Sequence, residues 1–247
     1  MRPPLRSLAG TLTGVLLLIS GPAFANVAFF DGTFDLANYT ASPVFTSSDI
    51  ALSYDQCASC GNPGQGLQLI ASYSLDSSGD AAVGLANTTF SYDPLTQGAI
   101  LSINASVDKD LIDNYPFGGA FGNTFHPLIE QDGNFYIASI PGTGGTAPGS
   151  TGYNTISQSG LVATDFEEYD FTTGSFVAAF PNFAGDPMLF GLAQIFSSGT
   201  AYTVYTSEAD YDNLELTIVN TVPEPASILL IGAALAGLAG LRRRTRA

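Results

Sequence analysis

The stretch Leu67–Asp76, LQLIASYSLD, decides the fold, because apolar and mostly polar residues alternate along it with a period of two. Successive side chains of a β-strand point to opposite faces, whereas an amphipathic helix repeats about every 3.6 residues. The same alternation returns at Leu101–Asp108 and at Leu214–Val219. Each of these stretches therefore predicts a strand with one face buried and the other in water.

Further runs are rich in β-branched and aromatic residues, which suit a pleated and half-buried surface. They are Val27–Phe30, Val44–Leu52, Val83–Tyr92, Phe135–Ile140, Phe176–Phe180 and Tyr202–Thr206. Turn-forming clusters such as Asn62-Pro63-Gly64 separate the runs, and Met188–Phe196 fits a helical turn as well as a strand. About ten short strands with this spacing predict an all-β fold, a β-sandwich of the jelly-roll type.

The first 25 residues have the three parts of a secretory signal peptide. A basic start with Arg2 and Arg6 precedes an apolar, helix-forming core at Leu8–Ile19. The small-residue cleavage site Ala23-Phe24-Ala25 follows, so signal peptidase is expected to cut directly before Asn26. No twin-arginine pair occurs in this segment, and export through the Sec translocon is therefore expected.

The last 26 residues combine a proline-bracketed glutamate, an apolar run and a basic end. The motif consists of Val222, Pro223, Glu224, Pro225 and Ala226, and the basic end contains Arg242, Arg243, Arg244 and Arg246. The apolar run Ala226–Leu241 has 16 residues and would be about 24 Å long as a helix. A bilayer core is about 30 Å thick. The run therefore fits a weak single-span anchor or a transient sorting signal that is cut off, as in GPI signals.

This order of motif, apolar span and arginine cluster resembles the PEP-CTERM sorting domain of exported Gram-negative proteins. The resemblance implies transient insertion into the inner membrane and cleavage near the motif by an exosortase, a transpeptidase-like membrane enzyme. It also implies delivery to the cell surface or extracellular matrix of bacteria that secrete exopolysaccharide and form biofilm. The expected organisation is a signal peptide (1–25), an acidic β-sandwich domain (26–220) and a sorting signal (221–247) with motif 222–226, span 226–241 and tail 242–247.

The predicted domain is strongly acidic. The chain has 7 basic and 22 acidic residues, and six of the basic residues lie in the two terminal signals. Lys109 and 21 acids remain in the domain, a net charge of −20. Nucleic-acid binding is excluded, because it needs a basic surface. Divalent cations are the obvious counter-ions, and Ca²⁺ prefers oxygen ligands. The favoured interpretation is nevertheless an acidic surface that only confers solubility, and a defined Ca²⁺ site is the alternative.

Two short motifs near the ends of the predicted domain resemble the first and last strands of lectin-like and carbohydrate-binding jelly rolls. They are Phe29–Phe34 (FFDGTF) and Tyr211–Leu216 (YDNLEL). The resemblance implies a concanavalin A-like or galactose-binding-like sandwich whose terminal strands pair. Acidic residues beside these strands often hold a structural Ca²⁺ in such folds, so Asp31 and Asp212 are candidate ligands. No other cofactor is expected.

Cys57 and Cys60 form a C-x-x-C motif. Because the chain carries an export signal, a disulfide is the expected state. A zinc site would need two further ligands, and the domain offers no other cysteine and only one histidine. The motif therefore predicts a local staple of a turn, with a redox role as the alternative.

Three further groups have both a functional and a structural interpretation. His126, the only histidine, would suit a catalytic triad, but no G-x-S-x-G motif occurs. The run Asp165–Asp170 (DFEEYD) is an acidic surface, a cation site or a carboxylate pair for glycoside hydrolysis. A glycine-rich stretch carries aromatic side chains that either stack on sugar rings or pack beneath a loop; they are Tyr115, Phe117, Phe121 and Phe125.

These patterns predict an exported, non-enzymatic protein with a structural or adhesive role in an exopolysaccharide matrix, in contact with polysaccharide. One alternative is a secreted glycan hydrolase or lyase on the same fold. It would need a carboxylate pair in a concave groove, for which Glu130, Glu167 and Glu168 are the candidates. The other alternative is an inert matrix component that is recognised only by its tail.

Overall fold

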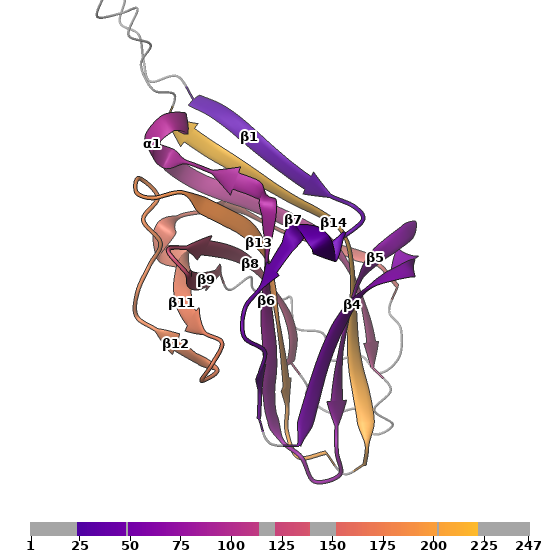
Figure 1. Cartoon of the computed structure of the whole chain (residues 1–247). Coiled ribbons are helices and arrows are strands. Elements are labelled where there is room, and N and C mark those ends of the chain that lie inside the picture. Colours follow the sequence, from indigo (N-terminus) through magenta and orange to yellow (C-terminus); the bar gives the residue numbers. More distant parts are fainter. Residues whose placement is uncertain (1–23, 48, 114–121, 139–151, 202, 222–247) are drawn as a thin grey trace, which may run out of the picture.

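The computed structural model describes residues 24–47, 49–113, 122–138, 152–201 and 203–221. Within these ranges the chain forms a sandwich of two antiparallel sheets (Figure 1). No helix of the described part is long and apolar enough to cross a membrane. The predicted signal helix and the predicted transmembrane helix both lie outside these ranges.

The strands divide between two sheets. Sheet A contains β1 (Phe24–Asp31), β4 (Ile50–Gly61), β5 (Gly64–Tyr73), β7 (Ile100–Asp113), β10 (Asn154–Leu161) and β14 (Tyr205–Thr221). Sheet B contains β2 (Tyr39–Ala41), β3 (Phe45–Thr46), β6 (Gly79–Tyr92), β8 (Gly122–Gln131), β9 (Asn134–Ala138), β11 (Phe166–Asp170), β12 (Ser175–Val177) and β13 (Met188–Ser198). The described helices are the short η1 (Leu36–Asn38), α1 (Pro94–Gln97) and η2 (Ala163–Asp165). The predicted all-β sandwich of jelly-roll type is therefore confirmed.

The long strand β14 organises sheet A, whose strand order is β10-β7-β14-β5-β4. One edge of β14 pairs with β7 along nearly its whole length. The other edge is shared, because β5 pairs with β14 up to Tyr211 and β1 takes over from Leu214. The first and last strands of the domain thus lie side by side, as the jelly-roll resemblance implied (Figure 1).

A bulge in β14 separates the part paired with β5 from the part paired with β1. Asn213 sits in it with a φ of +51°, in the left-handed region that asparagine tolerates better than most residues. The extra residue changes which positions face inward. As a result Tyr211 and Leu214, three residues apart, are both fully buried in the core.

The core lies between the sheets and confirms the alternation from which the fold was predicted. Leu67, Leu69, Ala71 and Tyr73 are each at most 1% exposed. The inward side chains of sheet B are largely aromatic; they include Phe90, Tyr92, Phe125, Phe190 and Phe196. The prediction that Leu75 and Leu101 face the core is wrong. Leu75 lies beyond the end of β5 and is 58% exposed, and Leu101 of β7 is 40% exposed.

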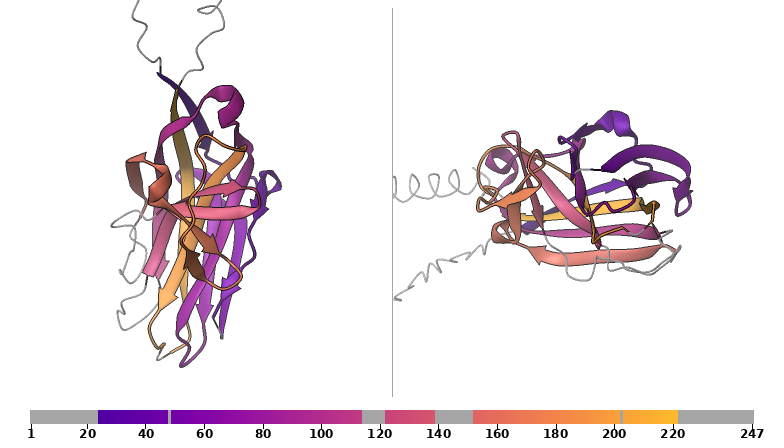
Figure 2. Two further views of the ribbon diagram at one scale, coloured as in Figure 1. Left: turned by 90° about the vertical axis from the view of Figure 1, so that its left-hand side faces the viewer. Right: turned by 90° about the horizontal axis from the view of Figure 1, so that it is seen from below.

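Sheet B has the order β12-β11-β9-β8-β13-β6-β2, and β3 pairs with a further part of β6. The run Met188–Phe196, which fits a helical turn as well as a strand, belongs to the interior strand β13 of this sheet. Both faces of this sheet carry apolar side chains, and Figure 2 gives two further views of the sandwich. The outer face is covered by a second, smaller cluster of Ala82, Ala86, Leu128, Ile137, Tyr169, Phe171 and Ala193.

Several predicted strand boundaries are wrong. The run Val44–Leu52 is interrupted, so that β3 ends at Thr46 and β4 begins at Ile50, with Asp49 at a φ of +65° between them. The run Phe176–Phe180 contributes only the last residues of β12. β8, which lies between β9 and β13, was not predicted at all.

Both ends of the described sandwich lie at the same pole. Phe24, at the start of β1, is directly opposite Thr221, at the end of β14 (Figure 1). The predicted signal-peptidase site between Ala25 and Asn26 therefore falls inside β1, after its second residue. Cleavage there would leave six of the eight residues of the strand.

Candidate functional site

A pocket of about 260 Å³ opens at the edge of sheet B, where the turn between β8 and β9 meets the end of β11. The turn is tight because Asp132 and Gly133 both take positive φ values, 55° and 80°. Strand β11 pairs with β9 and brings the predicted acidic run beside this turn. The pocket is lined by Pro43, Gly133, Asn134, Phe135, Glu168, Tyr169, Asp170, Phe171 and Thr172.

Aromatic rings form the apolar part of this pocket. Phe171 packs edge-on against Phe135 and Tyr169, with ring centroids 5.7 and 4.8 Å apart. Phe176 of β12 packs edge-on against Tyr169 at 5.0 Å and is 48% exposed. Phe176 is therefore an exposed ring that packs on Tyr169, a buried residue of the pocket lining, and a held, exposed ring is what a sugar-stacking platform requires.

The polar part of the pocket is held in place by short-range hydrogen bonds. The carboxylate of Asp170 accepts them from the Thr172 main-chain N–H and from the Thr173 hydroxyl. The first of these bonds contributes most to lowering the pKa of Asp170. Burial, reinforced by the charges of Asp80 and Asp170, raises the pKa of Tyr169 to about 12. At neutral pH the pocket therefore offers a carboxylate and a neutral phenol, both suited to hydroxyl groups.

The predicted acidic run divides between the faces of β11. Asp165 precedes the strand and its carboxylate accepts from the Val162 main-chain N–H. Glu167 and Glu168 are successive residues of β11, so their side chains leave opposite faces. The third carboxylate of the hydrolase alternative, Glu130, accepts from the main-chain N–H of Gly133.

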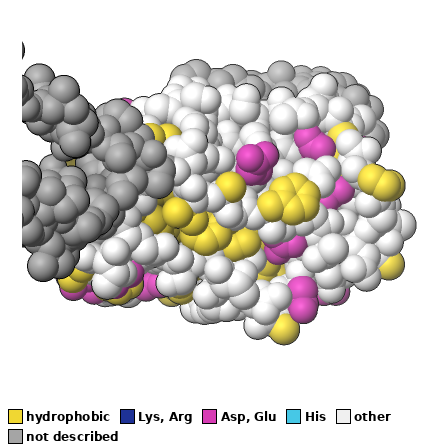
Figure 3. All heavy atoms as spheres, turned by 90° about the horizontal axis from the view of Figure 1, so that it is seen from above, with side chains coloured by type: hydrophobic (Ala, Val, Ile, Leu, Met, Phe, Trp, Pro, Cys, Tyr) yellow, Lys and Arg dark blue, Asp and Glu magenta, His cyan; other side chains and the backbone are white. Residues whose placement is uncertain are grey.

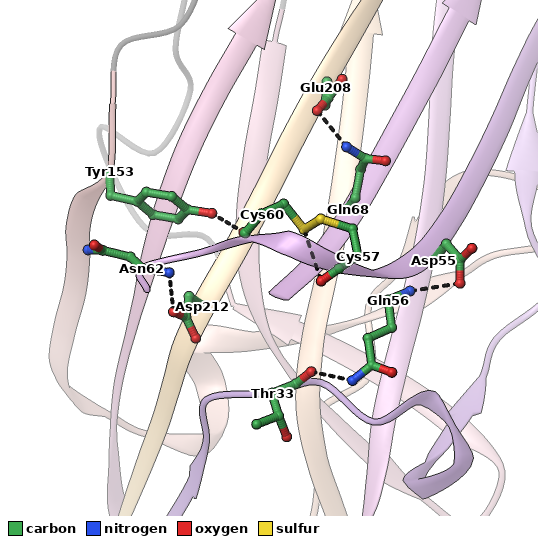
Figure 4. Close-up of a disulfide and its surroundings, with 10 residues drawn as sticks. All are labelled: Thr33, Asp55, Gln56, Cys57, Cys60, Asn62, Gln68, Tyr153, Glu208 and Asp212. Atoms are coloured by element: carbon green, nitrogen blue, oxygen red, sulfur yellow. Dashed lines mark hydrogen bonds between the residues drawn. A yellow bond between two sulfur atoms is a disulfide. The ribbon is translucent and has the colours of Figure 1, made fainter. Parts of the chain in front are cut away.

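The predicted staple between Cys57 and Cys60 is present as a disulfide in β4 (Figure 4). The main chain around it is tied to distant strands, because the Tyr153 hydroxyl donates to the Cys60 carbonyl and the Asn62 N–H donates to Asp212. The disulfide thus belongs to the β4–β5 hairpin, whose tip rests on the bulge of β14 (Figure 4).

The two predicted calcium ligands are engaged by protein donors. Asp31 accepts from the main chain of Thr33 and Phe34, and from the side chains of Tyr39 and Asn87. Asp212 accepts from the N–H groups of Asn62 and Asn213. Within the described ranges no three Asp, Glu, His or Cys side chains are placed to hold one metal ion. Calcium binding at Asp31 or Asp212 stays a prediction.

His126 is buried in β8. Its two ring nitrogens lie 3.0 Å from the Ala138 carbonyl oxygen and 3.0 Å from the Thr124 hydroxyl. Burial, together with the nearby charge of Lys109, lowers the pKa of His126 to about 4. The imidazole is therefore neutral at neutral pH and serves as a hydrogen-bonded interior group.

Replacing His126 with glutamine tests this burial through pH dependence. The native imidazole takes up a proton only near pH 4, whereas an unfolded histidine does so near pH 6.5. Between these values the unfolded state binds more protons, so the wild type loses stability as the pH falls. From about pH 7.5 to about pH 5, the unfolding free energy of the wild type should drop relative to the variant by about 2 kcal/mol. Urea unfolding at both pH values measures this, and an unchanged difference would contradict it.

Other predicted site residues lie in the core or outside the described ranges. Phe125 is fully buried with its ring 6.0 Å from that of Tyr211. The neighbouring aromatics Tyr115, Phe117 and Phe121 lie outside the described residues. So do Ala23, the motif Val222–Ala226 and the arginine cluster.

The described surface has no basic side chain to balance its acids. Lys109 is 4% exposed, and its ammonium group donates to the main-chain oxygen of Asn123 and lies 5.6 Å from the centre of the Tyr211 ring. Burial lowers the pKa of Lys109 to about 7. On the face seen in Figure 3, acidic and apolar side chains intermingle, and no Lys or Arg is visible among the described residues.

A protein-family model of the PEP-CTERM protein-sorting motif matches residues 221–244. With the sandwich that precedes it, this match defines an exported, cell-surface-directed β-sandwich protein. The chain carries a PEP-CTERM sorting motif, which confirms the resemblance of the C-terminus and implies processing by an exosortase. No curated protein matches the chain.

Solved structures similar to the chain include a family 11 carbohydrate-binding module of the cellulosomal cellulase Lic26A-Cel5E from Clostridium thermocellum. It is 12% identical, with 83% of this chain and 99% of that chain covered and a TM-score of 0.39. Basic winged bean lectin is 11% identical, with 81% and 100% covered and a TM-score of 0.30. At this identity the likeness says nothing about a ligand.

Proposed function

We propose that the chain is an exosortase substrate whose β-sandwich has a structural or adhesive role at the cell surface or in an exopolysaccharide matrix. One observation carries the proposal: the sorting motif begins at Thr221, the residue at which β14 ends. Thr221 is held to the domain, since its N–H and hydroxyl both donate to the Ala99 carbonyl. Cleavage within the motif would therefore remove the tail and leave every described strand in the processed protein.

The position of the two chain ends supports the proposed route. Sec export followed by transient insertion of the tail into the inner membrane of a Gram-negative cell would tether the domain at both ends. Because Phe24 and Thr221 are paired neighbours, both tethers leave from one pole, and the sandwich can fold while both are still attached. Signal peptidase and exosortase would then release a mature domain that begins at Asn26 and ends within the sorting motif.

The proposed role is non-enzymatic, with polysaccharide contact at the pocket beside β11. Phe176 supplies an exposed ring that packs on Tyr169 of the pocket lining, and Asp170 and Asn134 supply polar groups of the same lining. This combination suits a sugar ring, which has an apolar face and a rim of hydroxyls. An acidic domain would contact neutral polysaccharide directly and anionic polysaccharide through divalent cations.

Substituting Phe176 with alanine tests the carbohydrate contact. Losing a stacking ring costs about 0.5–1.5 kcal/mol, so binding of the processed protein to the exopolysaccharide of its producer should weaken by about two- to tenfold. Sedimentation with the purified polysaccharide, with and without Ca²⁺, measures this binding.

Phe30→Ala is the matched control, because Phe30 is also exposed, at 63%, but belongs to β1 of the other sheet. It should bind like the wild type. An equal loss of polysaccharide binding in both variants would show that the pocket beside β11 is not the binding site. If the wild type does not bind the polysaccharide either with or without Ca²⁺, the proposed polysaccharide contact is refuted. The proposed processing by an exosortase would not be affected by that result.

A further inference from the structure

Five carboxylates lie on the outer face of sheet A, on the neighbouring strands β7 and β14. Residues two apart in a strand share a face, so Asp108 and Asp110 lie with Glu208, Asp210 and Asp212. The register places Asp110 opposite Asp210 and Asp108 opposite Asp212. Opposite side chains of an antiparallel pair have Cβ atoms about 4.5–5.5 Å apart. The two strands therefore bring like charges close together.

Three of these carboxylates, those of Asp110, Asp210 and Asp212, are buried, and no described Lys or Arg side chain lies on this face. Asp110 is 8% exposed and Asp210 is 5% exposed. The basic residue between Asp108 and Asp110, Lys109, points to the other side of the sheet, into the core. Burying like charges side by side is costly, so a bound cation would stabilise this face.

Asp210 has an oxygen that no protein donor satisfies. Both oxygens of Asp212 accept main-chain hydrogen bonds, whereas Oδ1 of Asp210 is buried and has no hydrogen-bond partner in the described part. Burial, followed by the charge of Glu208, raises the pKa of Asp210 to about 7. A buried acceptor without a donor is rare in folded proteins and often marks a missing water or ion.

We propose that Asp110 and Asp210 bind a Ca²⁺ ion on the outer face of sheet A. Only oxygen ligands are offered here, because Cys57 and Cys60 are joined in a disulfide and His126 belongs to sheet B. Oxygen ligands select hard cations, and Ca²⁺ accepts more irregular ligand geometry than Mg²⁺. The site is distinct from Asp31 and Asp212 and independent of the carbohydrate pocket.

The rest of the coordination shell comes from groups other than acidic side chains. No three described Asp, Glu, His or Cys residues can hold one metal together, so water must supply several ligands. Gln68 lies opposite Asp210 on β5, and its amide nitrogen donates to Glu208. Through its amide oxygen, Gln68 is a further candidate ligand of the proposed site. With two carboxylates, the expected Kd is about 10⁻⁴–10⁻³ M, as for extracellular calcium modules.

Thermal unfolding of the full-length chain in mild detergent tests the site. Calcium at about ten to a hundred times its Kd should raise the melting temperature of the wild type by roughly 3–10 °C relative to EDTA in sodium chloride of matched ionic strength. Asp210→Asn and Asp110→Asn should each lose most of this gain. Without calcium, Asp210→Asn should melt at or above the wild-type temperature, because the buried charge is removed.

Glu215→Gln is the matched control, since it removes one exposed negative charge from the same strand. It should keep the full calcium gain. Two results would overturn the site: a wild type that gains nothing from calcium, or an Asp210→Asn protein that gains as much as Glu215→Gln. Calorimetric titration with calcium gives a second readout, and the absence of saturable binding by the wild type would equally overturn the proposal.

Discussion

Substituting Glu224 with alanine is expected to leave nearly all of the protein unprocessed in the inner membrane. Glu224 is the only charged residue of the motif Val222–Ala226, and alanine removes the carboxylate that the exosortase is proposed to recognise. Intact-mass spectrometry of the protein from its producer measures the outcome. The wild type should have lost the apolar span and the arginines, whereas the variant should still end at Ala247.

Ser227→Ala is the matched control for this substitution. Ser227 follows the motif directly, and alanine keeps the length and apolar character of the span, so processing should continue. A mature wild-type protein that still ends at Ala247 would refute the sorting function. Normal processing of the Glu224 variant would show that the enzyme reads another part of the tail.

Substituting Gly191 with alanine is expected to prevent folding or to cost at least about 3 kcal/mol of unfolding free energy. Gly191 lies in β13, in the middle of sheet B, between Ala86 of β6 and Leu128 of β8. A Cβ atom there would lie 1.9 Å from the Leu85 carbonyl oxygen. Main chain cannot yield as a flexible side chain can, so β6 and β13 would have to separate.

Gly199→Ala is the control, because a Cβ at Gly199 would meet no atom within 4 Å. Its unfolding free energy should stay within about 0.5 kcal/mol of the wild type. Denaturant unfolding of both variants and the wild type measures the difference. Comparable stabilities of the Gly191 and Gly199 variants would show that sheet B tolerates a wider spacing between β6 and β13 than the structure has.

Sheet A was easier to predict from the sequence than sheet B, for a physical reason. The outer face of sheet A is largely polar, so its strands alternate visibly, as in Leu67–Tyr73. The outer face of sheet B is covered by the apolar cluster that includes Phe171 and Tyr169. A strand that is buried on both faces shows no alternation, which is why Met188–Phe196 was ambiguous.

The candidate sites were predictable only in part. The acidic run Asp165–Asp170 was recognised, but its position beside Phe135 depends on the pairing of β11 with β9. The acidic pair of Asp110 and Asp210 was missed, although Glu208, Asp210 and Asp212 repeat with the period of a strand. Their partner strand is about a hundred residues away in the chain, and sequence order does not show which strands will be neighbours.

The sequence by itself determined the all-β class, the sorting motif and the disulfide, since each depends on residues that are close together in the chain. Only the tertiary structure decided which carboxylates meet, because strand register sets the contacts between distant residues. The pairing of β7 with β14 puts Lys109 and Tyr211 in the core and brings Asp110 and Asp210 together on the outer face of sheet A.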